Sequence, residues 1–181
     1  MRPKRYSSEA IVLARRNFSE ADRILTVFSK HYGKIVLLAK GVRKPKSRKR
    51  GSIEIFSIFK FSSARGKVFD IVTEVEIIDS FNIIRDDLKK VSLAYFFMEV
   101  VDRITQEGEK STQMYKFINS FMEELISSKN LRKLKNEFIK EILTISGFWP
   151  ENRQIENPTK TLEYVLERKI SSARVGKKVL S

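Results

Sequence analysis

Alternating hydrophobic and polar positions dominate the first eighty residues and predict β-strands. Residues 8–14 form a short apolar run that is typical of a buried strand. Residues 22–29 and 34–39 are rich in β-branched and aromatic side chains and flank the turn sequence of residues 30–33. We therefore expect a first strand, a polar connector over residues 15–21, and then a β-hairpin.

Two further strands are predicted beyond residue 52, over residues 53–61 and 68–78. The inward face is expected to hold Ile53, Ile55, Phe59 and Phe61 of the first segment and Phe69, Ile71, Thr73, Val75 and Ile77 of the second. Five strands with short connections and basic loops are typical of a small closed or nearly closed antiparallel barrel such as the OB-fold.

The hydrophobic period changes from two to between three and four near Ser80, which predicts helices. Residues 86–104 are apolar nearly all round, so this helix is expected to be central and buried. Ser111 is expected to cap a second helix, residues 131–143 form a third that ends before Gly147, and residues 161–170 form a short fourth. The predicted fold class is α+β, with an OB-fold nucleic-acid-binding domain over residues 1–80 and a helical domain over residues 81–181 that ends in a basic tail.

The charge of the chain points to a polyanionic partner. The formal net charge is +14. Residues 1–80 hold 18 Lys and Arg against 8 Asp and Glu, whereas residues 81–181 hold 18 against 14. No apolar run approaches the roughly 20 residues of a spanning helix, and no signal-peptide pattern opens the chain. Nucleic acid is therefore preferred to a membrane surface, and a cytoplasmic location is expected.

Residues 40–51 form the most strongly charged segment, which we call the basic segment. It has seven cations and no acid, and three residues that interrupt regular structure, Gly41, Pro45 and Gly51. Like charges at this density disfavour helix or strand, so the segment is expected to be a loop that binds phosphates. A solvated surface loop is the simpler alternative. The expected DNA-binding residues are Lys40, Arg43, Lys44, Lys46, Arg48, Lys49 and Arg50, together with Arg15 and Arg16 of the connector.

Aromatic residues outside the alternating core pattern are candidates for base stacking. Tyr6, Phe18 and Tyr32 meet this condition, and packing within the protein is the alternative for each. The Met and Phe stripe of the second helix is read as core, with a groove for a partner peptide as its alternative.

No catalytic constellation is recognised, so the chain is predicted not to be an enzyme. It has no cysteine and a single histidine, His31, which lies beside a turn glycine. Asp86 and Asp87 fall in the first turn of a predicted helix, where acids favour the dipole. Neither a metal, nor a cofactor, nor a small-molecule substrate is expected.

Several segments, in this order, resemble the RecO family of bacterial recombination-mediator proteins. They are Ser-Glu-Ala-Ile-Val-Leu from Ser8, Glu-Ala-Asp-Arg-Ile-Leu-Thr-Val-Phe from Glu20, Tyr-Gly-Lys-Ile from Tyr32, Ala-Lys-Gly-Val-Arg-Lys-Pro-Lys-Ser-Arg from Ala39, Ile-Ile-Asp-Ser-Phe from Ile77, and the pair Gly147–Phe148. The resemblance implies an OB-fold, binding of single- and double-stranded DNA and annealing of complementary strands. It also implies work with RecR and single-stranded-DNA-binding protein to load the RecA recombinase, and a location at the bacterial nucleoid.

One part of the chain departs from the family pattern. Many members carry a four-cysteine zinc site after the glycine–aromatic pair, whereas residues 151–158 here contain no cysteine. The resemblance therefore implies a zinc-free helical domain that folds without metal.

The resemblance also implies that the helical domain docks the acidic, apolar C-terminal tail of single-stranded-DNA-binding protein. The third predicted helix offers apolar residues beside cations: Leu131, Arg132, Lys133, Leu134 and Lys135. An amphipathic core helix with a solvated charged face is the alternative.

Two other functions fit the residues alone. Small basic barrels also bind RNA, so an RNA-binding module of the translation apparatus is the main alternative. An adaptor whose helices dock a protein is the other. The oligomeric state, the RecR-binding surface and the strand preference are left open by the sequence.

Overall fold

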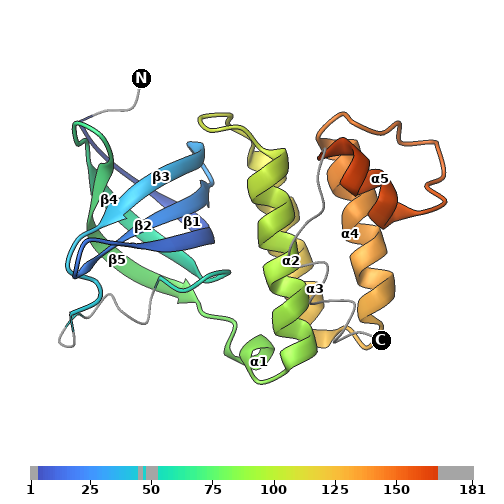
Figure 1. Ribbon diagram of the computed structural model, residues 1–181, viewed down its shortest axis with the longest axis horizontal. Coiled ribbons are helices and arrows are strands. Elements are labelled where there is room, and N and C mark those ends of the chain that lie inside the picture. The colour runs from blue at the N-terminus through green and yellow to red at the C-terminus, as the bar shows by residue number, and fades with distance from the viewer. Residues whose placement is uncertain (1–3, 45–46, 48–52, 167–181) are drawn as a thin grey trace. The chain divides into compact units, whose positions relative to one another are not determined.

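The computed structural model describes residues 4–44, 47 and 53–166 of the chain. They form two compact units, one built of strands and one of helices (Figure 1). The first unit takes in the chain up to residue 81 together with residues 106–115, and the second takes in residues 82–105 and the chain from residue 116. The connection at residues 106–115 thus packs with the strands although helices precede and follow it. The division into two domains at residue 80 stays a prediction.

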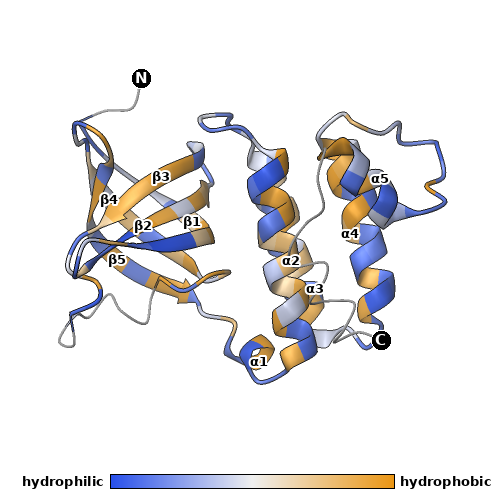
Figure 2. Cartoon of the chain, viewed as in Figure 1, coloured by the Kyte–Doolittle hydropathy of each residue, from blue (hydrophilic) through white to orange (hydrophobic). Residues whose placement is uncertain are grey.

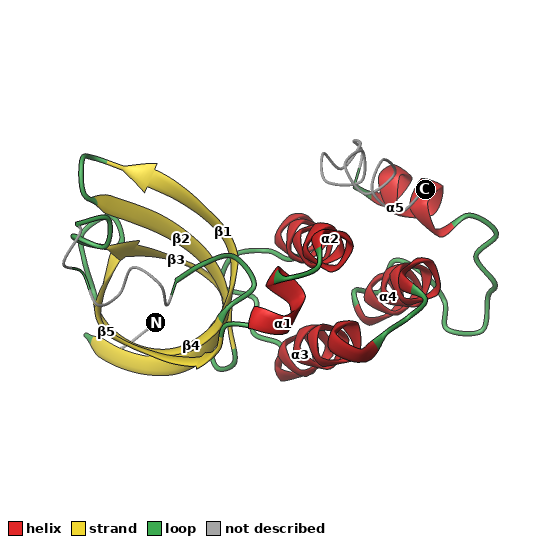
Figure 3. Ribbon diagram, turned by 90° about the horizontal axis from the view of Figure 1, so that it is seen from below, coloured by secondary structure: helices red, strands yellow, loops and turns green. Residues whose placement is uncertain are grey.

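The strands close into a barrel, as Figure 3 shows. They are β1 (Arg5–Phe18), β2 (Asp22–Ser29), β3 (Gly33–Ala39), β4 (Ile58–Ala64) and β5 (Asp70–Asp79). Their order around the barrel is β1-β2-β3-β5-β4, and every pairing is antiparallel except that of β3 with β5. This closed five-stranded connectivity is that of the OB-fold, and the predicted fold class is confirmed.

Alternate residues of the strands fill the barrel interior, which is what stabilises it. β2 contributes Leu25 and Val27, and β3 contributes Ile35, Leu37 and Ala39, all of them buried. Removal of these apolar side chains from water supplies the driving force for closing the sheet. The positions that face the barrel core therefore alternate along both strands of this hairpin.

The prediction of a strand from residue 53 was wrong, because β4 begins only at Ile58. Phe56 has a φ of +60°, which breaks an extended chain, and its ring is fully buried. The backbone here instead bonds to β1: Phe56 N–H donates to the Val12 carbonyl over 2.8 Å, and Val12 N–H donates to the Ser57 carbonyl over 3.1 Å. Residues 53–57 therefore pack against β1 as an irregular segment.

The predicted inward face of β5 was wrong in its first half. The β4–β5 pairing steps from Ser62 with Glu74 to Ser63 with Val72, so β5 advances two residues against one of β4. Such a bulge reverses the faces of the residues that precede it. Asp70 and Val72 consequently point inward in that half, whereas Val75, beyond the bulge, packs against the core as predicted. Ile77, which was also predicted to face the core, is 42% exposed.

The helices begin and end near the predicted positions. They are α1 (Asn82–Arg85), α2 (Leu88–Ile104), α3 (Thr112–Ser127), α4 (Leu131–Ile145) and α5 (Pro158–Val165). Asp87 caps α2, and the Ser111 hydroxyl accepts from Met114 N–H over 3.0 Å at the start of α3. α5 begins at Pro158 rather than residue 161, because Asn157 caps it with proline in the first turn. Residues 167–170, the predicted end of this helix, lie outside the described residues.

Aromatic rings form the centre of the helical unit. Phe97 of α2 stacks on Phe138 of α4 at 4.0 Å between ring centroids, and Phe117 and Phe121 of α3 surround the pair. Figure 2 shows that α4 carries hydrophobic and hydrophilic residues along its length, as expected for an amphipathic helix. Within the described part of the chain, no helix combines the length and apolarity needed to cross a membrane.

Candidate nucleic-acid interface

The basic segment begins on a backbone framework that ties it to the β1–β2 turn. Gly41, at a φ of +67°, donates its N–H to the Asp22 carboxylate over 2.8 Å. Arg43 N–H donates to the Ala21 carbonyl over 2.9 Å, and the Arg43 guanidinium donates to the Ser19 carbonyl over 3.2 Å. These bonds hold the start of the segment against the tip of the first hairpin.

Buried side chains lie within and just beyond the basic segment. Val42 and Ile53 both lie in the barrel core and are fully buried. Lys40 and Lys44 are exposed and Arg43 is half-buried. The remaining predicted cations, Lys46, Arg48, Lys49 and Arg50, lie outside the described residues. Val42, near the start of the basic segment, and Ile53, two residues beyond its end, are thus both fixed in the barrel core.

Arg15 and Arg16 were expected in a connector, but they belong to β1, which continues to Phe18. A register shift between Val12 and Ala14 lets the strand bend and continue alongside β2. Arg15 pairs with the Glu54 carboxylate at 2.7 Å, and Arg23 pairs with the same carboxylate at 3.2 Å. Arg16 is exposed, and none of the described carboxylates lies within ion-pair distance of it. Arg16 is thus better placed than Arg15 to meet a phosphate.

An aromatic contact joins the β1–β2 hairpin to the β4–β5 loop. Phe18, the last residue of β1, meets Phe69 edge-to-face at 6.1 Å between ring centroids. In OB-folds these two loops frame the surface that binds oligonucleotides. Phe18 is 44% exposed and Val68, next to Phe69, is 82% exposed. The contact therefore presents apolar surface where that fold binds its ligand.

The other two stacking candidates are packed. Tyr6 is buried, its hydroxyl donates to the Asp70 carboxylate over 2.6 Å, and its ring lies 4.7 Å from that of Tyr32. Tyr32 is half-buried, with the Lys110 ammonium 5.7 Å from its ring centroid. Of the three candidates, Phe18 is the one whose ring is substantially exposed.

His31 takes part in a chain of hydroxyl contacts. Its Nδ1 lies 3.0 Å from Ser8 Oγ, and the Ser29 hydroxyl donates to Ser8 Oγ over 2.9 Å. Ser29 and Ser8 are buried, and these contacts fix the β2–β3 turn against β1. The described residues contain no cluster of three side chains able to hold a metal ion.

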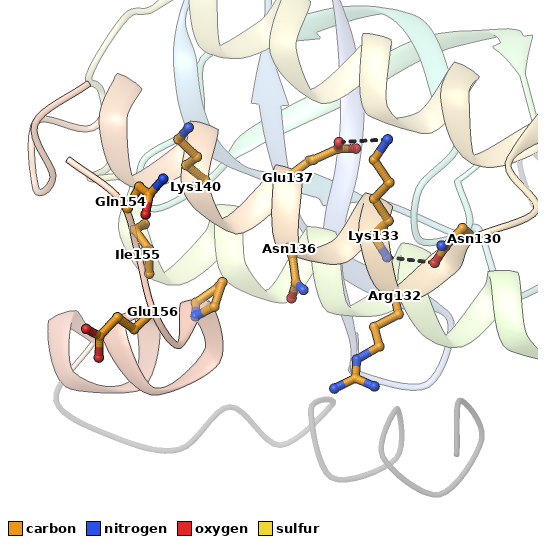
Figure 4. Close-up of a pocket in the computed structure, with 10 residues that line it drawn as sticks. Asn130, Arg132, Lys133, Asn136, Glu137, Lys140, Gln154, Ile155 and Glu156 are labelled. Carbon is orange, nitrogen blue, oxygen red and sulfur yellow. Dashed lines mark hydrogen bonds and ion pairs between the residues drawn. The ribbon is translucent and has the colours of Figure 1, made fainter. Parts of the chain in front are cut away.

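A cavity of about 560 Å³ lies beside α4 in the helical unit (Figure 4). Its cationic lining comes from Arg132, Lys133 and Lys140 of α4, and Ile155 and Pro158 contribute apolar surface. The full lining is Asn130, Arg132, Lys133, Asn136, Glu137, Lys140, Gln154, Ile155, Glu156 and Pro158. The cavity therefore combines three cations, two carboxylates and a small apolar surface in its lining.

Carboxylates in and near the cavity partly offset its positive charge. Glu137 pairs with Lys133 at 3.7 Å on the helix surface. Partial burial raises the pKa of Glu141, the carboxylates of Glu124 and Glu137 raise it further, and Lys140 lowers it. The like charges of Glu137 and Glu141, four residues apart on α4, therefore repel each other weakly.

The comparison with known proteins assigns the chain to a family. Residues 1–81 match the family model described as Recombination protein O N terminal, and residues 85–154 match that described as Recombination protein O C terminal. This chain belongs to the recombination protein O family, RecO. The expected resemblance is confirmed over both units.

Similar RecO-family proteins are each named DNA repair protein RecO. That of Pelotomaculum thermopropionicum is 33% identical over 147 residues, covering 81% of this chain and 57% of the relative. That of Desulforamulus reducens is 35% identical over 148 residues, covering 82% and 57%, and that of Dehalococcoides mccartyi is 32% identical over 156 residues, covering 86% and 62%. The chain thus spans about three fifths of the length of these relatives.

Within this RecO-family chain, the structure brings together only part of what the sequence suggested. Arg43, Arg16 and Phe18 lie on or against the first hairpin. Leu134, predicted to contact a partner, is buried in the helical core instead, and Lys135 lies over the Phe96 ring at 4.7 Å. This part of the prediction was wrong because the helical period turns Leu134 to the same side as Phe138.

The sequence analysis also missed candidate residues in the β4–β5 loop of the barrel and in the cavity beside α4. The β4–β5 loop contributes exposed Arg65 and Lys67 beside Val68 and Phe69. The signal in the sequence was the pair of cations, Arg65 and Lys67, between the two predicted strands. Lys140 of the cavity was missed because it lies two helical turns beyond Arg132 and Lys133, and only the fold shows that the three line one cavity.

Proposed function

We propose that this chain is a non-enzymatic DNA-binding mediator of recombinational repair. It binds single- and double-stranded DNA, anneals complementary strands, and acts with RecR to help load RecA onto DNA coated by single-stranded-DNA-binding protein. Membership of the RecO family and the names of the relatives support this role. The observation that carries the proposal is the basic segment bonded through Arg43 to the ligand-binding hairpin of an OB-fold.

Phosphate neutralisation supplies most of the affinity in this proposal. Lys and Arg side chains displace condensed counterions from the nucleic acid, which is favourable and independent of base sequence. Annealing then requires no bond-making chemistry, because cations that hold two strands lower their mutual repulsion and raise their local concentration. A net charge of +14 suits this mechanism.

The test of this proposal is neutralisation of the basic segment. Changing Arg43, Lys44, Lys46 and Arg48 together to Gln should weaken binding to every DNA sequence alike. The log–log dependence of affinity on salt should flatten by about 0.7 unit for each phosphate of a single strand that the variant no longer neutralises. Affinities are measured by fluorescence anisotropy from 50 to 300 mM NaCl, and annealing is measured with complementary strands coated by single-stranded-DNA-binding protein.

Two controls separate this effect from others. Changing Lys89, Lys116, Lys129 and Lys160 to Gln removes the same charge from exposed positions of the helical unit and should leave the salt slope nearly unchanged. A second variant changes Lys44, Lys46 and Arg48 to Gln but keeps Arg43, and with it the bond to the Ser19 carbonyl. It tests whether loss of that bond, rather than loss of charge, weakens DNA binding. Unchanged affinity and salt slope in the segment variant would contradict the proposal. If the wild type binds structured RNA as tightly as single-stranded DNA at the same salt concentration, an RNA-binding role is favoured.

The cavity beside α4 is the proposed docking site for the acidic, apolar C-terminal tail of single-stranded-DNA-binding protein. Arg132, Lys133 and Lys140 of α4 line this cavity together with the apolar side chains of Ile155 and Pro158. An acidic peptide with apolar side chains is complementary to such a lining.

Charge reversal tests this docking site. Changing Arg132, Lys133 and Lys140 to Glu should abolish binding of the tail peptide while naked single-stranded DNA still binds. The matched control is charge reversal of Lys89, Lys116 and Lys129, which lie outside the cavity lining. If the peptide binds the cavity variant as it binds the control, the tail docks elsewhere.

A further inference from the structure

We propose that one edge of β5, at residues 74–79, binds an extended segment of a partner protein in which cationic and apolar residues alternate. We call this stretch the acidic edge; its sequence is Glu-Val-Glu-Ile-Ile-Asp. The inference goes beyond the proposed DNA binding and does not rest on it. Its basis is the way in which the barrel closes.

The contact between β3 and β5 that closes the barrel is short. β3 pairs with β5 at two positions, Leu37 with Asp70 and Leu38 with Ile71. From there β5 continues to Asp79 with β4 along one side. Among the described residues, none pairs with the other side of the acidic edge. The unpaired N–H and C=O groups of such an edge form a template for pairing with another chain.

The opposite end of the same contact shows how this protein covers an open strand edge. At the start of β3, Lys34 forms a parallel bridge with Glu107, and Gly108 N–H donates to the Lys34 carbonyl over 2.8 Å. A segment from elsewhere in the chain thus extends the sheet beside β3. A segment of another protein can extend it beside β5 in the same way, which is the β-augmentation mode of peptide recognition.

The apolar side chains of the acidic edge are exposed. Ile77 and Ile78 are 42% and 52% exposed, although neighbouring residues of a strand point to opposite faces. Single exposed apolar residues are ordinary on protein surfaces. Two adjoining ones on an unpaired edge are not, because proteins usually protect such edges from association. The isoleucines therefore add apolar contact surface to the unpaired backbone groups.

The charge of β5 identifies the occupant. The strand carries four carboxylates and no cation in a chain of net charge +14; they belong to Asp70, Glu74, Glu76 and Asp79. Three of them lie on the acidic edge, and Lys60, opposite Glu76 on β4, offsets one. These carboxylates repel the phosphates of nucleic acid, and they would also repel a second copy of the same strand. A segment with alternating cations and apolar residues is complementary to both the carboxylates and the isoleucines.

The experiment separates backbone pairing from simple attraction of charge. The probe is a fluorescein-labelled, end-capped peptide of four Lys-Val repeats, and the comparison is the same peptide N-methylated at every second residue. Methylation removes N–H donors but no charge. The wild type should bind the unmodified peptide at least about tenfold more tightly, because main-chain hydrogen bonds supply affinity in β-augmentation. Amide hydrogen exchange over residues 74–79 should slow when that peptide is bound.

A charge variant tests the side chains. Glu74→Gln and Glu76→Gln, combined, should weaken peptide binding about fivefold at 50 mM NaCl, because each cross-strand charge pair contributes modestly. The loss should shrink at 300 mM NaCl. The matched control combines Glu123→Gln and Glu151→Gln, which removes the same charge from exposed positions of the helical unit. This control should bind the peptide as the wild type does.

Equal binding of the two peptides, or equal binding by the wild type and the β5 variant, would overturn the inference. Neutralising the basic segment is compared with the matched change of Lys89, Lys116, Lys129 and Lys160 to Gln. If it strengthens peptide binding more than that change does, the chain's own cations occupy the edge and the inference falls. Self-association that the β5 variant abolishes, measured by analytical ultracentrifugation, would place a second copy there and overturn it as well. The β5 variant should bind single-stranded DNA no more weakly than the wild type, so failure of this inference leaves the proposed function standing.

Discussion

Asp70 lies inside the barrel at a position that strict alternation assigns to the solvent face. Its carboxylate accepts a hydrogen bond of 2.6 Å from the hydroxyl of Tyr6, which is itself buried. Asp70 was predicted to face the solvent because it is charged, and Tyr6 was predicted to be available for base stacking. Leu134 shows the opposite error, since its apolar side chain was assigned to a partner and packs in the core. A residue type alone does not settle burial, because the bulge in β5 and the rotation of α4 decide which way each side chain points.

We expect Tyr6→Phe to destabilise the barrel by about 1–2 kcal/mol, because a hydrogen bond to a buried carboxylate is worth more than a neutral one. The ring contacts with Tyr32 and Phe61 are kept in this variant. The measurement is urea unfolding followed by circular dichroism at pH 7. Tyr164→Phe is the control, since Tyr164 is 86% exposed and should lose no stability. Coincident unfolding curves for Tyr6→Phe and the wild type would show that the bond contributes nothing.

At the scale of elements, periodicity predicted the strands and the principal helices because their apolar faces are regular. It failed at the start of β4 and at the first half of β5. The positive φ of Phe56 could not be predicted from the sequence, because phenylalanine does not favour this conformation. Gly33 marks the β2–β3 turn correctly, with a φ of +65°. Its second role was invisible in the sequence: the segment around Glu109 packs against it from more than seventy residues away.

Gly33→Ala tests this packing between a turn and a distant segment. A Cβ at Gly33 would lie 1.8 Å from the Glu109 carbonyl oxygen, and the left-handed backbone adds about 1–2 kcal/mol of strain for an L-residue. The total loss of stability should therefore exceed about 2 kcal/mol.

The matched control is Gly108→Ala, where φ is +81° but no atom lies within 4 Å of the added Cβ. That variant incurs the backbone strain alone. Thermal unfolding of both variants separates the two contributions. Equal losses in the two would mean that the contact of Gly33 with the Glu109 carbonyl is relieved at no cost.

At the scale of the whole molecule, the charge led to the proposed class of partner, and the barrel shows where some of the cations lie. The sequence placed the excess positive charge in residues 1–80 and identified the basic segment. It could not show that Arg43 bonds to the first hairpin, nor that Lys67 lies in the loop whose Phe69 touches Phe18. These relations join segments separated by tens of residues, and local patterns carry no information about such distances. Action with RecR and loading of RecA are likewise proposed functions of this chain.

The excess charge also makes a prediction about the free protein. The protein has a net charge of +14, so at low ionic strength its excess Lys and Arg side chains repel one another in the folded state. Added salt screens that repulsion. Raising NaCl from 50 to 300 mM should therefore raise the melting temperature of the free protein, even as it weakens binding to DNA. With a saturating single-stranded oligonucleotide at 50 mM NaCl, the melting temperature should rise through ligand binding, and this gain should shrink as salt increases. The two salt effects have opposite signs because the same cations repel one another in the free protein and attract phosphates in the complex. A free protein whose melting temperature falls over this salt range would show that its attractive ion pairs, which salt also screens, outweigh the repulsion among its excess cations.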